Sequence, residues 1–204
     1  YKRQIEQADV VYVSDFKGGV DFSCGWKDFV YLVTDEKKLL ELLNRLARTL
    51  EKRKQLFKEV EAANITEYRQ KAGDYMQRIV FACDEVAELL DRTGADKERK
   101  ELLAQIEARL ALIARQGRAF GIHLILATQR PDANILSGQI KNNMNIRICG
   151  RADTTLSTII IGDGRAAEQI PHDAQGRFLM EDGTVFQAYY FCLLYTSDAA
   201  DDRI

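Results

Sequence analysis

Two pairs of polar residues follow two apolar runs, and their side chains could together hydrolyse a nucleoside triphosphate. Asp84 and Glu85 come directly after the run 79–83 (IVFAC), and Thr128 and Gln129 come directly after the run 122–127 (IHLILA). An aspartate at a strand tip can hold Mg²⁺ through its water shell, and an adjacent glutamate can orient or deprotonate the attacking water. A polar residue on the neighbouring strand can contact the γ-phosphate, a role that fits Gln129.

The two apolar runs are the elements that must position these side chains. Uninterrupted apolar runs of this length are typical of strands buried on both faces, as in a parallel sheet covered by helices. Ligands of such sheets bind beyond the carboxyl ends of the strands, so we expect both polar pairs at one edge. An alternative stays open for Asp84 and Glu85, because the first turn of a helix also favours acidic side chains.

Residues 115–131 carry a longer pattern, RQGRAFGIHLILATQRP, which resembles the signature of the FtsK/SpoIIIE family of DNA-pumping ATPases. Residues 10–19 (VVYVSDFKGG) resemble the strand that follows the P-loop helix in that family. Residues 140–151 (IKNNMNIRICGR) resemble the family's next helix and strand. The resemblance covers roughly positions 8 to 190, which is most of the chain.

The resemblance implies an α/β fold: a RecA-like P-loop NTPase core with a mostly parallel sheet flanked by helices and a C-terminal β-hairpin. It implies a motor that uses ATP and Mg²⁺ to pump double-stranded DNA as a hexameric ring. Asp84 would then hold Mg²⁺ through water, Glu85 would activate water, and Thr128 and Gln129 would contact the nucleotide. Asp15 ends an early strand near the nucleotide edge, where a place in the site and an ordinary turn both remain open.

An arginine from a neighbouring subunit often neutralises transition-state charge in ring ATPases. By alignment to the family pattern, Arg151 is the expected trans-acting residue, while Arg118 is an alternative that could instead form a salt bridge within the subunit. The family usually follows this arginine with a Ser-rich, basic segment, whereas residues 152–156 are ADTTL. This departure leaves the details of subunit coupling open.

The chain contains no Gly-x-x-x-x-Gly-Lys-Ser/Thr segment, the loop whose amides and lysine cradle the phosphates. The nearest candidate, residues 17–19 (KGG), lacks the ending of that loop. We therefore expect an N-terminally truncated motor domain that is inactive by itself. A degenerate homologue that does not hydrolyse ATP is the alternative.

Residues 192–201 (CLLYTSDAAD) resemble a translated transposase adapter from DNA library preparation. We therefore divide the chain into a partial motor domain, residues 1–191, and a non-native tail, residues 192–204, which is set aside from fold reasoning. A genuine acidic tail is the alternative.

Composition sets broader limits. A chain of 204 residues with 46% apolar content can bury one substantial core, and its 29 basic and 31 acidic residues argue against a generally basic nucleic-acid binder. Four scattered cysteines without a Cys-x-x-Cys motif suit a reducing cytoplasm. No apolar run approaches the ~18 to 20 residues of a membrane span. We expect a cytoplasmic motor whose full-length protein is membrane-anchored through regions outside this sequence.

Periodicity predicts alternating strands and helices. Thr34 is expected to cap a helix over 35–62, with a leucine stripe on one face and a solvated charged face at 52, 53, 54 and 58. Asn64 begins a short helix, and His123 is expected to be a packed core residue rather than a metal ligand. The other expected elements are a strand at 10–14, an apolar segment at 29–33, a helix at 97–117, strands at 122–127 and 146–150, and a hairpin of 177–180 with 184–190.

Two rival functions remain. One is a type VII-like secretion ATPase, which shares the core and takes a protein cargo; the DFKGG version of the early strand resembles that branch and the branch on Gram-positive conjugative elements. The other is a non-hydrolysing ring subunit or adaptor.

Overall fold

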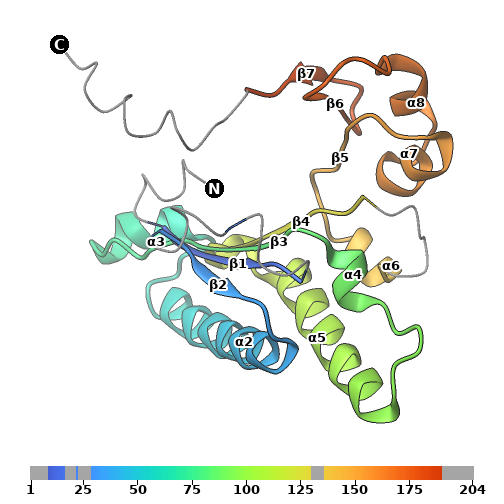
Figure 1. The fold of residues 1–204 in the computed structure, drawn as a ribbon. Coiled ribbons are helices and arrows are strands. Elements are labelled where there is room, and N and C mark those ends of the chain that lie inside the picture. The colour runs from blue at the N-terminus through green and yellow to red at the C-terminus, as the bar shows by residue number, and fades with distance from the viewer. Residues whose placement is uncertain (1–8, 17–21, 23–28, 130–135, 190–204) are drawn as a thin grey trace. The chain divides into compact units, whose positions relative to one another are not determined.

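The structure is a computed structural model that describes residues 9–16, 22, 29–129 and 136–189 (Figure 1). The chain divides into two compact units, which are described separately below. The first comprises residues 1–129 and 134–143, and the second comprises residues 130–133 and 144–204.

A parallel four-stranded sheet forms the centre of the first unit. Its strands are β1 (Val10–Ser14), β2 (Tyr31–Val33), β3 (Ile79–Cys83) and β4 (Ile122–Leu126). They are arranged in the order β2-β1-β3-β4. The register pairs Ser14 with Cys83 and Cys83 with Leu126, so the carboxyl ends of β1, β3 and β4 are level with one another.

The two apolar runs differ in burial. All five residues of β3 are buried, as the sequence predicts. The same prediction is wrong for β4, in which only Ile122 is buried and Ile125 is 39% exposed. Within the described part of the chain β4 pairs with β3 alone, and a strand at the edge of a sheet has fewer neighbours to cover its side chains.

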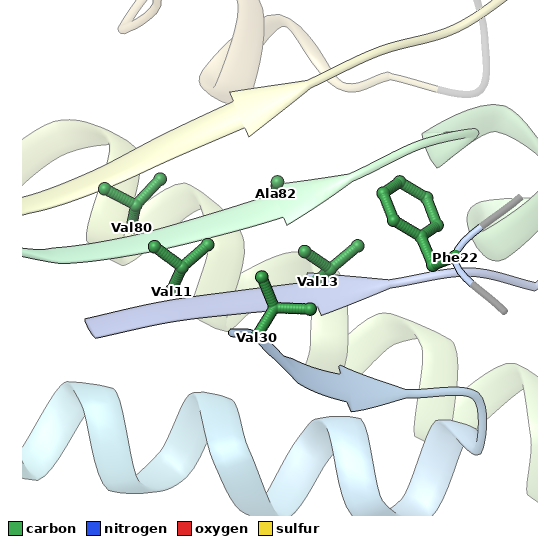
Figure 2. Close-up of a cluster of buried hydrophobic side chains, with 6 residues drawn as sticks. All are labelled: Val11, Val13, Phe22, Val30, Val80 and Ala82. Carbon is green, nitrogen blue, oxygen red and sulfur yellow. The ribbon is translucent and has the colours of Figure 1, made fainter. Parts of the chain in front are cut away.

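An apolar cluster covers one face of β1 and β3. It consists of Val11, Val13, Phe22, Val30, Val80 and Ala82. Figure 2 shows these side chains gathered along the two strands. Because side chains alternate between the faces of a strand, Tyr12 and Phe81 point to the opposite face.

Two long helices, α2 (Glu36–Glu59) and α5 (Lys97–Gln116), lie together on one side of the sheet (Figure 1). Helix α2 begins one residue later than predicted. Its cap is Asp35 rather than Thr34, because the Asp35 carboxylate accepts a hydrogen bond from the Lys38 amide at 2.9 Å. The helix ends at Glu59 and not at residue 62.

Arg53 corrects the prediction of a wholly solvated charged face on α2. Its side chain is 7% exposed, since position 53 continues the buried stripe that runs through Leu46, Leu50 and Phe57. The guanidinium donates to the carbonyls of Phe120 at 2.6 Å, Gly121 at 3.3 Å and Gln77 at 2.7 Å. Arg53 therefore ties α2 to the segments that enter β3 and β4.

Shorter helices complete the first unit. Asn64 caps α3 (Ile65–Ala72) as predicted, accepting from the amides of Thr66 and Glu67. The remaining elements are α4 (Val86–Leu90), η1 (Arg118–Phe120) and α6 (Gly138–Lys141). No helix in the described residues has the length and apolar character needed to cross a bilayer.

The second unit contains an antiparallel sheet of β5 (Ile148–Cys149), β6 (Arg177–Met180) and β7 (Val185–Gln187) in that order. The predicted hairpin is confirmed by β6 and β7, and Gly183 adopts a φ of 90° in the turn between them. The predicted strand 146–150 is reduced to β5, which pairs antiparallel with β6. Helices α7 (Thr154–Ile161) and α8 (Arg165–Gln169) pack on this sheet around Cys149 and Leu179.

Candidate functional site

The polar residues singled out in the first unit follow the carboxyl ends of the parallel strands β1, β3 and β4. We refer to this row of strand ends as the edge of the sheet. Main-chain hydrogen bonds continue beyond the strands and fix this edge. The Asp84 amide donates to the Ser14 carbonyl at 3.2 Å, and the Ala127 amide donates to the Cys83 carbonyl at 2.9 Å. The tips of β1, β3 and β4 are therefore held together by backbone bonds, as the predicted arrangement requires.

Glu85 is the most constrained of these residues. It is 4% exposed. Its Oε1 accepts a hydrogen bond from Thr128 Oγ1 at 2.6 Å, and its Oε2 accepts one from the Gln129 backbone amide at 2.9 Å. Burying a carboxylate without hydrogen-bond donors would cost free energy, so these two contacts explain how the Glu85 side chain remains buried.

The helix-start alternative explains the backbone here but not the side chain. Helix α4 does begin directly after Glu85, which occupies the cap position. However, the Glu85 carboxylate makes no capping hydrogen bond to α4. Both of its oxygens instead contact the residues that follow β4. The side chain is thus directed across the sheet edge rather than onto its own helix.

Two aspartates flank Glu85 at the same edge. Asp15 is 1% exposed at the tip of β1, and its amide donates to the Val33 carbonyl at 3.2 Å. Asp84 is half-buried at the tip of β3. Because β1 and β3 are neighbouring strands whose last residues, Ser14 and Cys83, are register partners, Asp15 and Asp84 follow adjacent strand ends.

Carboxylates at a strand tip are the kind of ligand that Mg²⁺ takes in nucleotide enzymes. The described residues contain no group of three or more His, Cys, Asp or Glu that could form a complete metal cage. Mg²⁺ at phosphate-transfer sites needs no such cage, because it keeps several waters and binds one or two carboxylates plus substrate phosphates. Asp84, half-buried and partly accessible, is suited to bind through water.

Two further residues, Ser14 and Cys83, are the last residues of β1 and β3 and directly precede Asp15 and Asp84. The sequence did not single them out as part of the site. Ser14 is fully buried, and its hydroxyl donates to the Ala82 carbonyl at 3.4 Å. Burial raises the pKa of the Cys83 thiol from 9.0 to about 11, so this thiol is neutral at physiological pH. Ser14 and Cys83 are register partners, which only the strand pairing reveals.

The candidate arginines belong to other elements of the structure. Arg151 is exposed in the second unit, just after β5, and donates a hydrogen bond to the His172 carbonyl. Arg118 is exposed in η1, at the amino end of β4 and hence at the opposite end of that strand from Thr128. Residues 17–19, residue 130 and the tail 192–204 lie outside the described residues.

His123 does not belong to the site. It is half-buried near the beginning of β4, where burial, followed by the nearby Arg78, lowers its pKa from 6.5. His123 is therefore only half-buried and is not the buried core residue that the sequence predicts.

The parallel sheet flanked by helices has the RecA-like fold of the P-loop NTPases. A family model described as "FtsK/SpoIIIE family" matches residues 27–133. A DNA translocase FtsK from Campylobacter jejuni is 32% identical over 143 residues, which cover 68% of this chain and 14% of the relative. One from Chlorobaculum tepidum is 34% identical over 140 residues, covering 68% and 16%. The chain belongs to the FtsK/SpoIIIE family.

Solved structures agree on the fold. The pCW3 conjugation coupling protein TcpA, in its monomer form with ATPγS, superposes with a TM-score of 0.86 at 38% identity, covering 92% of this chain and 54% of that chain. The cytoplasmic domain of the type VII secretion ATPase EccC from Thermomonospora curvata gives 0.63 at 23% identity, covering 89% and 22%. At that identity, the likeness to EccC shows a shared fold alone.

Proposed function

We propose that this chain is part of an ATP-driven motor domain that moves double-stranded DNA and works as a hexameric ring. The observation that carries this proposal is the buried Glu85 carboxylate, held by Thr128 and the Gln129 amide at the edge where the tips of β1, β3 and β4 meet. A general base needs this kind of fixed orientation, and ATP hydrolysis depends mainly on positioning and charge stabilisation.

Each residue at the edge has a definite task in this proposal. Glu85 orients the attacking water and accepts its proton at a carboxylate oxygen. Thr128 keeps that carboxylate turned toward the edge, and the exposed Gln129 side chain contacts the γ-phosphate while its backbone amide holds Glu85. Asp84, with Asp15 at the tip of the neighbouring strand, would hold Mg²⁺ through its water shell, and the metal would supply neutralisation of phosphate charge.

Two comparisons support DNA as the cargo. The curated relatives are DNA translocases, and TcpA is a conjugation coupling protein. The identity to TcpA is 38% and covers 92% of this chain, whereas the identity to the FtsK relatives is 32% and 34% and covers 68%. This difference favours the conjugative branch. In this proposal the motor is cytoplasmic, and its full-length protein is membrane-anchored through other regions. Arg151 completes the site of the neighbouring subunit.

The test uses the full-length protein that carries this region together with a P-loop. We expect ATP turnover that requires Mg²⁺ and rises when linear double-stranded DNA is added, together with displacement of a triplex-forming oligonucleotide from that DNA. Turnover that responds to a secretion-signal peptide and not to DNA would replace the DNA motor by a secretion motor. Absence of turnover under both conditions would indicate an adaptor.

The 204-residue chain itself makes a useful negative control. It contains no Gly-x-x-x-x-Gly-Lys-Ser/Thr segment, so its site lacks the amides and the lysine that hold the phosphates. We expect neither tight ATP binding nor turnover from this chain alone. Hydrolysis that disappears in Glu85→Gln of the same chain would contradict this expectation.

A further inference from the structure

A surface hollow lies between the outer strand of the parallel sheet and helix α2, and none of the residues assigned above lines it. We call it the tyrosine cleft, and its lining consists of Tyr12, Tyr31, Leu32, Val33, Lys38, Glu41, Leu42, Arg45 and Arg48. It is an open hollow of about 540 Å³. That volume falls within the range of ~300 to 1,000 Å³ that is common for small-ligand sites.

The aromatic part of the cleft is built by strand register. Tyr12 of β1 and Tyr31 of β2 are direct neighbours in the parallel pairing, so both rings lie on the same face of the sheet. Their centroids are 5.2 Å apart with an interplanar angle of 29°, which is a stacked arrangement. Tyr12 is half-buried, whereas Tyr31 is 65% exposed. The stack therefore presents an aromatic ring to solvent.

The charged part of the cleft comes from one stripe of α2. The Arg45 guanidinium lies 5.5 Å from the centroid of the Tyr12 ring, and its Nη2 donates to the Tyr12 hydroxyl at 3.5 Å. Lys38 and Arg48, both exposed, also line the cleft. Glu41 is the one acidic residue in that lining. From position 38 to position 48 the stripe extends about 15 Å along the helix axis.

We propose that the tyrosine cleft binds a single strand of nucleic acid, with a base stacked on Tyr31 and phosphates along Arg45, Arg48 and Lys38. Proteins that bind single strands combine a positively charged groove with aromatic rings on which bases stack. The length of the cationic stripe favours a strand over a free nucleotide. A duplex fits poorly, because its bases are already stacked on one another. This inference concerns binding and does not depend on the proposed ATPase.

The test is fluorescence anisotropy of a fluorescein-labelled oligothymidylate of about twelve nucleotides, within the site size of known single-strand binders, titrated with the 204-residue chain. Tyr31→Ala should weaken binding at least about fivefold, as expected for one lost base–aromatic stack. Tyr31→Phe, which keeps the ring, should bind like wild type. Because Tyr31 is 65% exposed, these substitutions leave the core intact.

Tyr75→Ala is the matched control. Tyr75 is 59% exposed and also has an arginine over its ring, with Arg69 Cζ 4.4 Å from the centroid, but it lies outside the cleft. We expect no change in affinity from this substitution. Equal weakening by Tyr31→Ala and Tyr75→Ala would overturn the proposal, because it would show general surface binding.

Salt dependence tests the phosphate contacts. Arg48→Ala should lower the slope of log affinity against log salt by about 0.7, the value for one phosphate contact on a single strand. Lys58→Ala, a charge removal in the last turn of α2, should leave the slope unchanged. The proposal fails if an abasic oligomer or a duplex binds as tightly as the oligothymidylate. It also fails if oligoglutamate displaces the oligothymidylate from the cleft at equal concentration, since the cleft would then be a peptide site.

Discussion

The Thr128 hydroxyl donates a 2.6 Å hydrogen bond to Oε1 of Glu85, joining the end of β4 to the acidic tip of β3. The acceptor is a buried carboxylate, so the bond is charge-assisted and stronger than one between neutral groups. Any shift of the segment after β4 therefore changes the position of the proposed general base. In the proposed mechanism, Thr128 therefore acts on the reaction by positioning Glu85.

Replacement of Thr128 by valine tests this relationship in the full-length motor. Thr128→Val preserves shape and removes the donor, and hydrogen bonds to charged groups contribute about 1.5 to 3 kcal/mol. We expect kcat to fall about tenfold or more, while KM for ATP changes by less than about twofold, since the bond orients the base and not the nucleotide. Steady-state ATPase kinetics measure both quantities.

Two further variants separate positioning from simple loss of structure. Thr128→Ser keeps the hydroxyl and should restore most of kcat. Thr49→Val removes another hydrogen-bonded threonine hydroxyl, which donates to the Arg45 carbonyl at 3.0 Å, and should leave turnover unchanged. A fall in kcat of the same size in Thr128→Ser as in Thr128→Val would show that the hydroxyl is not the relevant group.

Glu85→Gln examines the base itself. Glutamine can keep both contacts, because its carbonyl accepts from the Gln129 amide while its NH₂ donates to the Thr128 hydroxyl. We therefore expect unchanged ATP affinity, with turnover lower by about 10² to 10⁴, the usual contribution of a positioned base. Equilibrium binding of ATPγS and single-turnover hydrolysis measure the two effects. Turnover close to that of the exposed-site control Glu101→Gln would remove Glu85 from this role.

The sequence was sufficient to place the acidic pair at a buried strand tip and to expect a parallel sheet. This succeeded because β3 is apolar along its whole length and changes abruptly to Asp84 and Glu85. The hairpin of β6 and β7 was equally readable, because Gly183 supplies the positive φ that the turn requires. Both signals are local and depend on few neighbours.

The features that were missed depend on partners far away in the sequence. In the sequence, Arg53 is one more charge in a basic run, and only the Gln77, Phe120 and Gly121 carbonyls show why it is buried. Likewise, the exposure of Ile125 follows from the place of β4 at the edge of the described sheet and not from its composition. The bond between Thr128 and Glu85 spans 43 positions, so spacing alone could not reveal it.

The choice between Arg151 and Arg118 can be made with mixed rings of the full-length protein. A trans-acting arginine contributes about 10³ to 10⁵ in turnover, so Arg151→Ala should be almost inactive while still binding ATP. Arg118→Ala should retain activity. Mixing Arg151→Ala subunits with Glu85→Gln subunits should recover part of the turnover, because some sites then combine an intact Glu85 with an intact neighbouring Arg151. No recovery at any mixing ratio would argue against action between subunits.

Arg53 gives a prediction about stability. Arg53→Met keeps an apolar side chain on the buried stripe but leaves three carbonyls without their charged donor. We expect the free energy of unfolding of the 204-residue chain to fall by about 3 kcal/mol, in the range found when buried hydrogen-bonded charges are removed. Urea denaturation measures this value. Lys52→Met, at the adjacent exposed position, should change the free energy of unfolding by less than about 0.5 kcal/mol.

The pKa of Cys83 predicts how the stability of the 204-residue chain depends on pH. Burial raises this pKa from 9.0 to about 11, so between these values the unfolded chain loses the thiol proton while the folded chain retains it. The free energy of unfolding should therefore decrease as pH rises through this window, by up to about 2 to 3 kcal/mol from this group. Cys83→Ala should show a correspondingly flatter profile, although its stability near pH 7 is lower because the sulfur leaves a gap. Urea denaturation under reducing conditions at several pH values measures both profiles, and parallel curves for wild type and Cys83→Ala would show that this thiol does not cause the decrease.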